Sequence, residues 1–167
     1  AHLAGKPADC LAVTMQAAQW GMNPFAVAQK THVVNGTLGY EAQLVNAVVS
    51  SSNLLATRLN YHWDGDWSKV NGKDDKSPSL TVTVSATLKG ESEPRELTIS
   101  MAQAGVRNSP LWGQDPRQQL AYLCVKRWAR LHAPDVLLGV YTPDELQETA
   151  PRVERDITPA PATASGM

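Results

Sequence analysis

The stretch Asp115-Pro-Arg-Gln-Gln-Leu-Ala-Tyr-Leu-Cys-Val-Lys-Arg-Trp-Ala-Arg-Leu-His132 carries the clearest helical pattern of the chain. Its large apolar residues recur at spacings of three and four, which is typical of a helix that buries one face. They are Leu120, Leu123, Cys124, Trp128 and Leu131. Asp115 is a favourable N-cap and Pro116 suits the first helical position. We therefore predict one long amphipathic helix whose exposed side carries Lys126, Arg127 and Arg130.

The segments before this helix alternate as strands do. From Leu80 to Lys89 apolar side chains alternate with Thr and Ser, and Arg95–Ala102 follows the turn Gly90–Pro94. Leu54–Trp63 alternates in the same way. Strict alternation indicates strands with one buried face, so we expect an antiparallel meander packed against the long helix.

The N-terminal part predicts helices and a hairpin. Asp9–Trp20 forms a helix that should bury Leu11, Met15 and Ala18, followed by short helices at Pro24–Gln29 and Glu41–Ser52. Asn35-Gly36 favours a type I′ turn between His32 and Tyr40. The expected fold is therefore α+β, with residues 1–150 as one domain. Residues 151–167 contain only Val153, Ile157 and Met167 as large apolar residues and are expected to form a disordered tail.

Charge is unevenly distributed along a chain whose net charge is −1. Residues 107–132 hold five basic and one acidic side chain, whereas residues 135–156 hold six acidic and two basic ones. This is compatible with a basic face beside an acidic one, or with two ordinary solvated surfaces. Cys10 and Cys124 stand alone in apolar surroundings and are predicted to be buried free thiols. With no signal peptide or long apolar run, we expect a soluble intracellular protein, and the initial Ala1 suggests a fragment of a longer one.

Motifs for catalysis are weak. Asp64, Asp66 and Glu91 could gather around a divalent cation in a metal-dependent nuclease, although Asp-Gly-Asp is also an ordinary turn sequence. His32 and His62 have no nucleophile beside them, and no phosphate-binding loop follows Gly36 and Gly39. We predict that the chain is not an enzyme and uses no metal or cofactor.

Nucleic-acid binding has better support. The loop Arg107-Asn-Ser-Pro-Leu-Trp112 offers Arg107 and Asn108 as phosphate donors, and Trp112 either stacks on a base or plugs the core. Helical Arg117, Lys126, Arg127 and Arg130 either neutralise phosphates or form a solvated face. Trp20, Trp63 and Trp128 continue apolar stripes and are expected in the core.

Four segments resemble the RecT family of phage-type single-strand annealing proteins. They are Trp20-Gly-Met-Asn-Pro-Phe-Ala26 with Asn35-Gly-Thr-Leu-Gly-Tyr-Glu-Ala-Gln-Leu-Val-Asn46, the run 107–130, and Ala133-Pro-Asp-Val-Leu-Leu-Gly-Val-Tyr-Thr-Pro-Asp-Glu145. The resemblance spans about residues 7–146 and implies a sheet backed by a long helix. It also implies ATP-independent binding of single-stranded DNA left by a partner exonuclease, annealing to a complement, and a homo-oligomeric ring or helical filament that holds the duplex.

The resemblance also implies a basic groove that follows the DNA backbone. Its residues in this chain would be Arg107, Asn108, Trp112, Arg117, Lys126, Arg127 and Arg130, with Lys30 and Arg58 as further candidates. The acidic segment Thr142–Glu148, which begins with a capping-box pattern, is expected to contact a neighbouring subunit. The expected location is the cytoplasm of a bacterial host, with a phage or prophage gene.

Overall fold

The computed structural model describes residues 6–148, and the predicted tail 151–167 lies outside them. Helices α1 (Pro7–Trp20) and α2 (Pro24–Gln29) precede the hairpin β1 (Thr31–Val34) and β2 (Thr37–Tyr40). Helix α3 (Ala42–Ser50) leads to strands β3 (Asn60–Asp64), β4 (Thr81–Ala86) and β5 (Arg95–Ser100). A 3-10 turn (Met101–Gln103) and α4 (Leu111–Gln114) precede α5 (Pro116–His132), a second 3-10 turn (Pro134–Leu137) and α6 (Pro143–Glu148). The predicted α+β class and the long helix are confirmed.

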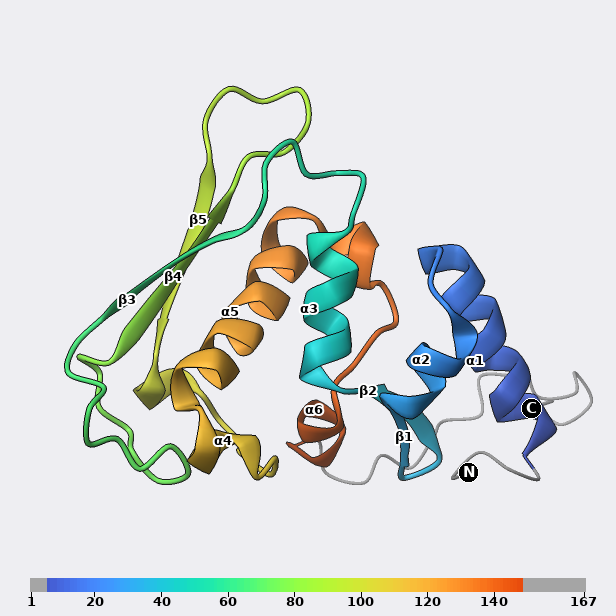
Figure 1. Cartoon of the computed structure of the whole chain (residues 1–167), viewed down its shortest axis with the longest axis horizontal. Coiled ribbons are helices and arrows are strands. Elements are labelled where there is room, and N and C mark those ends of the chain that lie inside the picture. The colour runs from blue at the N-terminus through green and yellow to red at the C-terminus, as the bar shows by residue number, and fades with distance from the viewer. Residues whose placement is uncertain (1–5, 149–167) are drawn as a thin grey trace, which may run out of the picture.

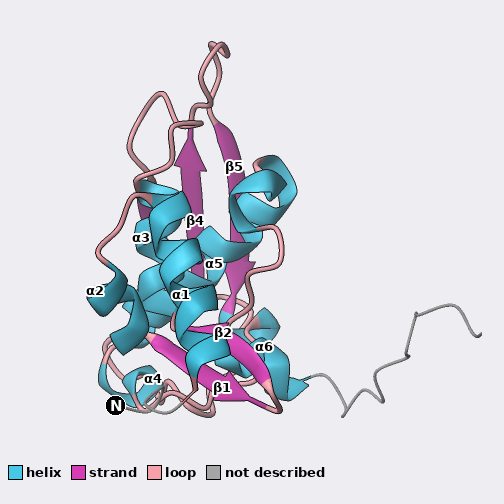
Figure 2. Cartoon of the chain, turned by 90° about the vertical axis from the view of Figure 1, so that its right-hand side faces the viewer, coloured by secondary structure: helices cyan, strands magenta, loops and turns pink. Residues whose placement is uncertain are grey.

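The three-stranded sheet is an antiparallel meander in the order β3-β4-β5. Val82 pairs with Trp63 on one side and with Ile99 on the other. Helix α5 lies between this sheet and α3, while α1 and α2 lie beyond α3 (Figure 1). Seen from the side, the β1–β2 hairpin lies near α6 and apart from the sheet (Figure 2).

The core centres on α5. Val82, Val84, Leu120, Cys124 and Trp128 are fully buried, and the Trp128 Nε1 donates to the Arg95 carbonyl at 2.9 Å. The helix also buries a second side, with Val125, Lys126 and Ala129 inaccessible or nearly so. This second side arises because α3 packs on α5 opposite the sheet. The apolar stripe identified in the sequence therefore accounts for only one of the two sides on which α5 is buried.

The N-terminal hairpin forms as predicted. Thr31 pairs with Tyr40 and Val34 with Thr37, and Asn35 and Gly36 have φ of 52° and 79°. Positive φ at both positions is what a type I′ turn requires.

Several local predictions are wrong. Helix α1 buries Val13 and Ala17, whereas Leu11 and Met15 are 61% and 64% exposed. The prediction failed because apolar residues occur on most sides of α1, so periodicity alone does not determine which face is buried. Cys10 is exposed, and only Cys124 is a buried thiol. Leu131 is 62% exposed in the last turn of α5, where Trp128 closes the core one turn earlier. Strand β3 begins only at Asn60, and Leu55 meets Leu88 through an isolated bridge.

Candidate nucleic-acid interface

A groove of about 580 Å³ lies beside α5, which we call the basic groove. Its walls come from α5, from β1 and the start of α3, from the loop before α4, and from the start of α6. Its cations, Lys126, Arg127 and Arg130, all come from α5, whereas the other walls contribute the carboxylates of Glu41, Asp144 and Glu145. His32, Asn108 and Gln119 are further polar residues of the lining. Arg130 lies four positions after Lys126 and three after Arg127, spacings at which side chains are neighbours on a helix, so the three cations line one groove.

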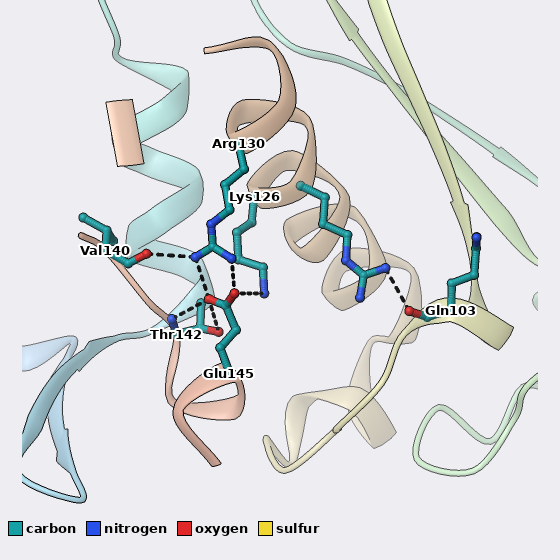
Figure 3. A network of polar contacts seen from close by, with 7 residues as sticks. Gln103, Lys126, Arg130, Val140, Thr142 and Glu145 are labelled. Carbon is teal, nitrogen blue, oxygen red and sulfur yellow. Dashed lines mark hydrogen bonds and ion pairs between the residues drawn. The ribbon is translucent and has the colours of Figure 1, made fainter. Parts of the chain in front are cut away.

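Glu145 holds two of these cations (Figure 3). Its carboxylate accepts hydrogen bonds from both terminal nitrogens of Arg130, with Nη2 at 2.7 Å from Oε1, and lies 3.5 Å from Lys126 Nζ. The Thr142 backbone N–H and hydroxyl also donate to Glu145 Oε1, at 2.9 and 3.1 Å. Glu145 therefore hydrogen-bonds to its N-cap residue Thr142, as the capping-box pattern predicted. It also neutralises positive charge of Lys126 and Arg130 on α5.

The charges of this cluster are strongly perturbed. Burial lowers the pKa of Lys126 to about 8, against the attraction of Glu145. Burial alone would raise the pKa of Glu145, but the hydrogen bonds from Arg130 and the charge of Lys126 lower it to about 2. Lys126 is therefore not on the exposed side of α5 as expected, and Glu145 contacts its own chain. The prediction that placed this acidic segment on a neighbouring subunit is corrected for Glu145.

Arg127 in the basic groove and Lys30 outside it also have partners. Arg127 is half-buried and donates to the Gln103 carbonyl at 2.8 Å. Lys30 Nζ lies 3.9 Å from Glu41, whose carboxylate is also 2.7 Å from His32 Nε2. Asn108 is exposed on the groove wall, and its backbone N–H donates to Asp144 at 3.4 Å.

Arg107 and Trp112 have a packing role. The Arg107 guanidinium is buried, donates to the carbonyls of Gly72 and Met101 at 2.8 and 2.6 Å, and lies 5.5 Å from the Trp112 ring centre. Burial lowers the pKa of Arg107. Trp112 is only 4% exposed, so the alternative of a core plug holds and the indole cannot stack on a base in this conformation. Neither side chain presents its polar or aromatic group to a strand of DNA here.

Arg117 and Arg58 lie away from the basic groove. Arg58 is exposed in the segment between α3 and β3. Arg117 is exposed in the first turn of α5, where its guanidinium lies 4.5 Å from the centre of the Trp63 ring. Trp63 is half-buried at the sheet edge and is not the core residue expected from its stripe.

Two residues of the basic groove were not predicted from the sequence. Gln119 is 4% exposed, lines the groove, and its Nε2 has no hydrogen-bond partner within residues 6–148. Glu145 was recognised only as a cap. A buried donor without an acceptor is costly, so Gln119 marks a place where a ligand acceptor would be stabilised.

The carboxylates of the nuclease alternative do not assemble. Asp64 pairs with Thr81 at one end of β4, whereas Glu91 lies in the turn after the other end of that strand. Asp66 accepts from the Ser68 hydroxyl at 2.6 Å, and Glu91 binds Arg95 through both oxygens. Among residues 6–148, no three His, Cys, Asp or Glu side chains come together as metal ligands. The nuclease alternative is therefore not supported by the geometry.

The fold and the groove define a mixed α+β domain with clustered cations on a long helix. The model of the RecT family matches residues 1–159, and the chain belongs to this family. RecT proteins anneal single-stranded DNA in recombination. A comparison with curated proteins finds no match. In the part of the chain described, every helix is too short or too polar to cross a bilayer.

Proposed function

We propose that this chain binds single-stranded DNA and anneals complementary strands without ATP in phage-type homologous recombination. The observation that carries the proposal is the gathering of Lys126, Arg127 and Arg130 on one groove, in a chain of the RecT family. Arg127 and Asn108 line the accessible part of that groove, and Gln119 offers an unused donor at its wall.

Glu145 supports the proposal by its geometry. A carboxylate held by two guanidinium nitrogens uses the same paired donors that bind phosphate oxygens. Arg130 and Lys126 are therefore arranged for an anion with two adjacent oxygens. A DNA phosphate entering the basic groove exchanges with Glu145 or binds beside it at Arg127. Internal neutralisation keeps the empty groove stable. DNA binding depends on salt because each phosphate that a groove cation neutralises releases counterions.

The mechanism is binding rather than covalent chemistry. Neutralised phosphates allow two strands to approach, and base pairing supplies the sequence check. Of the predicted contacts we retain Asn108, Lys126, Arg127 and Arg130 in the basic groove, with Arg117, Lys30 and Arg58 as outer contacts. Residues 1–150 form the annealing core in this proposal.

The assembly and the setting are part of the same proposal. Annealing proteins of this type hold a new duplex on a ring or helical filament, so we infer a homo-oligomer and a partner exonuclease that supplies the single strand. The corresponding location is the cytoplasm of a bacterial host that carries the gene on a phage or prophage.

An annealing assay tests the proposal. Labelled complementary oligonucleotides are mixed with the chain in Mg²⁺ without ATP, and products are separated on native and denaturing gels. Intact duplex formed faster than without protein is the expected result. Shortened strands would instead establish nuclease activity. If annealing is no faster than without protein and DNA binding does not depend on salt, the chain is a structural domain that does not bind DNA.

Charge reversal locates the interface. We expect Arg127→Glu to weaken binding to a single-stranded oligonucleotide by roughly tenfold or more at moderate salt and to lower the salt slope by about 1. Lys89→Glu is the matched control, because Lys89 makes the same charge change in the exposed turn beyond β4. Equal losses in both variants would show a general charge effect and not a groove.

A further inference from the structure

Two aromatic side chains at the edge of the sheet remain partly accessible, although Trp63 also packs against the rim of the core. Tyr61 and Trp63 lie two residues apart on β3, an edge strand, and so point to the same face. Their rings are stacked, with centres 5.8 Å apart and planes 18° apart. Tyr61 is 36% exposed and Trp63 is half-buried. A stacked pair that remains accessible offers ring surface to a ligand.

Neighbouring helices fix the orientation of both rings. The Tyr61 hydroxyl accepts a hydrogen bond from Asn46 Nδ2 of α3 at 3.3 Å. The Trp63 Nε1 donates to the Arg117 carbonyl of α5 at 3.0 Å, and the Arg117 guanidinium lies 4.5 Å from the Trp63 ring centre. Rings held in this way lose little conformational freedom when a planar ligand binds, which favours affinity.

These rings form one wall of a second groove of about 370 Å³, which we call the aromatic groove. Asp115, Arg117, Gln118, Ala121 and Tyr122 of the α5 end form the rest. The Asp115 carboxylate caps α5 by accepting from the Gln118 backbone N–H at 3.2 Å. Its negative charge opposes that of Arg117, so the aromatic groove suits an uncharged planar group better than a phosphate. Gln118 is exposed and can donate to or accept from the edge of such a group.

The aromatic groove adjoins the basic groove. Tyr122 lines both, and burial together with the nearby Tyr61 and Asp115 raises its pKa. Arg117 and Arg130 are thirteen positions apart on α5, which corresponds to about 20 Å along the helix axis. A strand that keeps the B-form rise of about 3.4 Å per nucleotide covers that length with about six nucleotides. One strand can therefore follow the basic groove and reach the aromatic groove.

We propose that the aromatic groove stacks one unpaired nucleobase of the bound single strand on Tyr61 and Trp63. The inference rests on the proposed function, since it assumes that DNA follows α5. Base stacking on aromatic side chains tolerates any base, which suits a protein that must accept every sequence. A complement that pairs with the held base removes it from the rings, so the site holds single strands more strongly than finished duplex.

Base-free DNA separates stacking from phosphate binding. Affinities of the full chain are measured by fluorescence anisotropy for a labelled thymidine oligonucleotide and for an abasic strand of equal length and charge. We expect the thymidine strand to bind roughly 5-fold to 100-fold more tightly. Tyr61→Leu should remove most of this preference without changing the affinity for the abasic strand. Tyr61→Phe, which keeps the ring, should retain the preference.

Four results would overturn the stacking site. Equal affinity of the unaltered chain for both strands would show that DNA is bound through phosphates alone, and the proposed function would stand. Equal losses on both strands in Tyr61→Leu would show a general defect. A changed sedimentation coefficient in Tyr61→Leu with the base preference intact would assign the β3 edge to a second copy of the chain. If the unaltered chain binds neither strand, the proposed function fails together with this inference.

Discussion

The two ends of α5 use arginine in opposite ways. Near the C-terminal end Arg130 and the buried Lys126 share the carboxylate of Glu145, with Arg130 also donating to the Val140 carbonyl at 2.8 Å. In the first turn Arg117 is exposed and lies on the ring of Trp63. The same helix therefore carries one neutralised, largely buried charge cluster and one accessible cation on an aromatic surface.

The difference follows from what covers the helix. Lys126 is 94% buried, and a buried ammonium without a partner is strongly disfavoured, so an acid must accompany it. Arg117 is in contact with solvent and requires no acid; the ring of Trp63 attracts it weakly. Position along the helix, and not residue type, therefore decides whether a cation is paired with an internal carboxylate or is exposed without one.

The largest effect is expected at Glu145. In Glu145→Gln the buried Lys126 loses its counter-charge and stands close to Arg130, so we expect the free energy of unfolding to fall by about 3–5 kcal/mol. Chemical denaturation followed by circular dichroism measures the change. Asp135→Asn is the matched control, because it removes the same charge at an exposed position in the 3-10 turn after α5 and should cost about 0.5 kcal/mol or less. Similar losses in the two variants would contradict a special role for Glu145.

Acid should disrupt the ion pairs of Glu145 with Lys126 and Arg130. The pKa of Glu145 lies at about 2 in the folded chain, below its ordinary value of 4.5. A carboxyl with a lowered pKa stabilises the fold above about pH 4.5, and this contribution disappears as the pH falls toward 2. We expect a loss on the order of 3 kcal/mol over this range.

The pH profile of Glu145→Gln isolates this contribution. Asp66, Asp75 and Glu91 also have lowered pKa values, set mainly by hydrogen bonds from Ser68, Ser77 and Arg95, and they titrate in both chains. The difference between the two profiles of unfolding free energy against pH therefore belongs to Glu145. Parallel profiles between pH 4.5 and 2 would show that Glu145 is not charged in an ion pair.

Gln119 should give a smaller effect of opposite sign. Its Nε2 is buried without a partner in the described chain, so Gln119→Leu removes an unsatisfied donor and should stabilise the fold by about 1–2 kcal/mol. The same change should weaken binding of single-stranded DNA if the donor serves a ligand. Gln118→Leu, at an exposed neighbouring position, should alter stability by about 0.5 kcal/mol or less. A destabilised Gln119→Leu variant would mean that the amide already has a partner in solution.

Much of the fold is predictable because its signals are local. The alternation of Thr81–Ala86, the Asn35-Gly36 turn and the Asp115-Pro116 start of α5 are each fixed by neighbours in sequence. The buried face of α1 is not, because Leu11 and Val13 are equally apolar and only the tertiary partner selects between them. The same holds for Trp63, whose alternation with Tyr61 gives its face but not its place at the sheet edge.

The site is predictable only in part, for the same physical reason. Sequence placed Arg127 and Arg130 on adjacent turns, and both line the basic groove. It could not show that Lys126 is buried, or that Glu145, fifteen positions after Arg130, returns to it. Arg107 was a candidate as a phosphate donor and Trp112 as a ring that stacks on a base or plugs the core. In the structure Gly72 approaches so closely that an added Cβ would lie 1.7 Å from the Trp112 carbonyl oxygen. That close packing encloses both side chains.

The smallest effect is expected at Arg117, and it sharpens the contrast between the two ends of α5. Arg117→Gln removes an exposed cation–π contact worth about 0.5–1 kcal/mol, whereas Arg130→Gln leaves Glu145 with only the buried Lys126 and should cost several times more. Denaturation midpoints of the two variants measure the difference. Arg117→Gln should nevertheless weaken binding of single-stranded DNA, because its guanidinium borders the aromatic groove. Equal destabilisation by both changes would mean that Arg117 also stabilises the fold. The N-terminal end of α5 would then no longer be supported as a DNA contact.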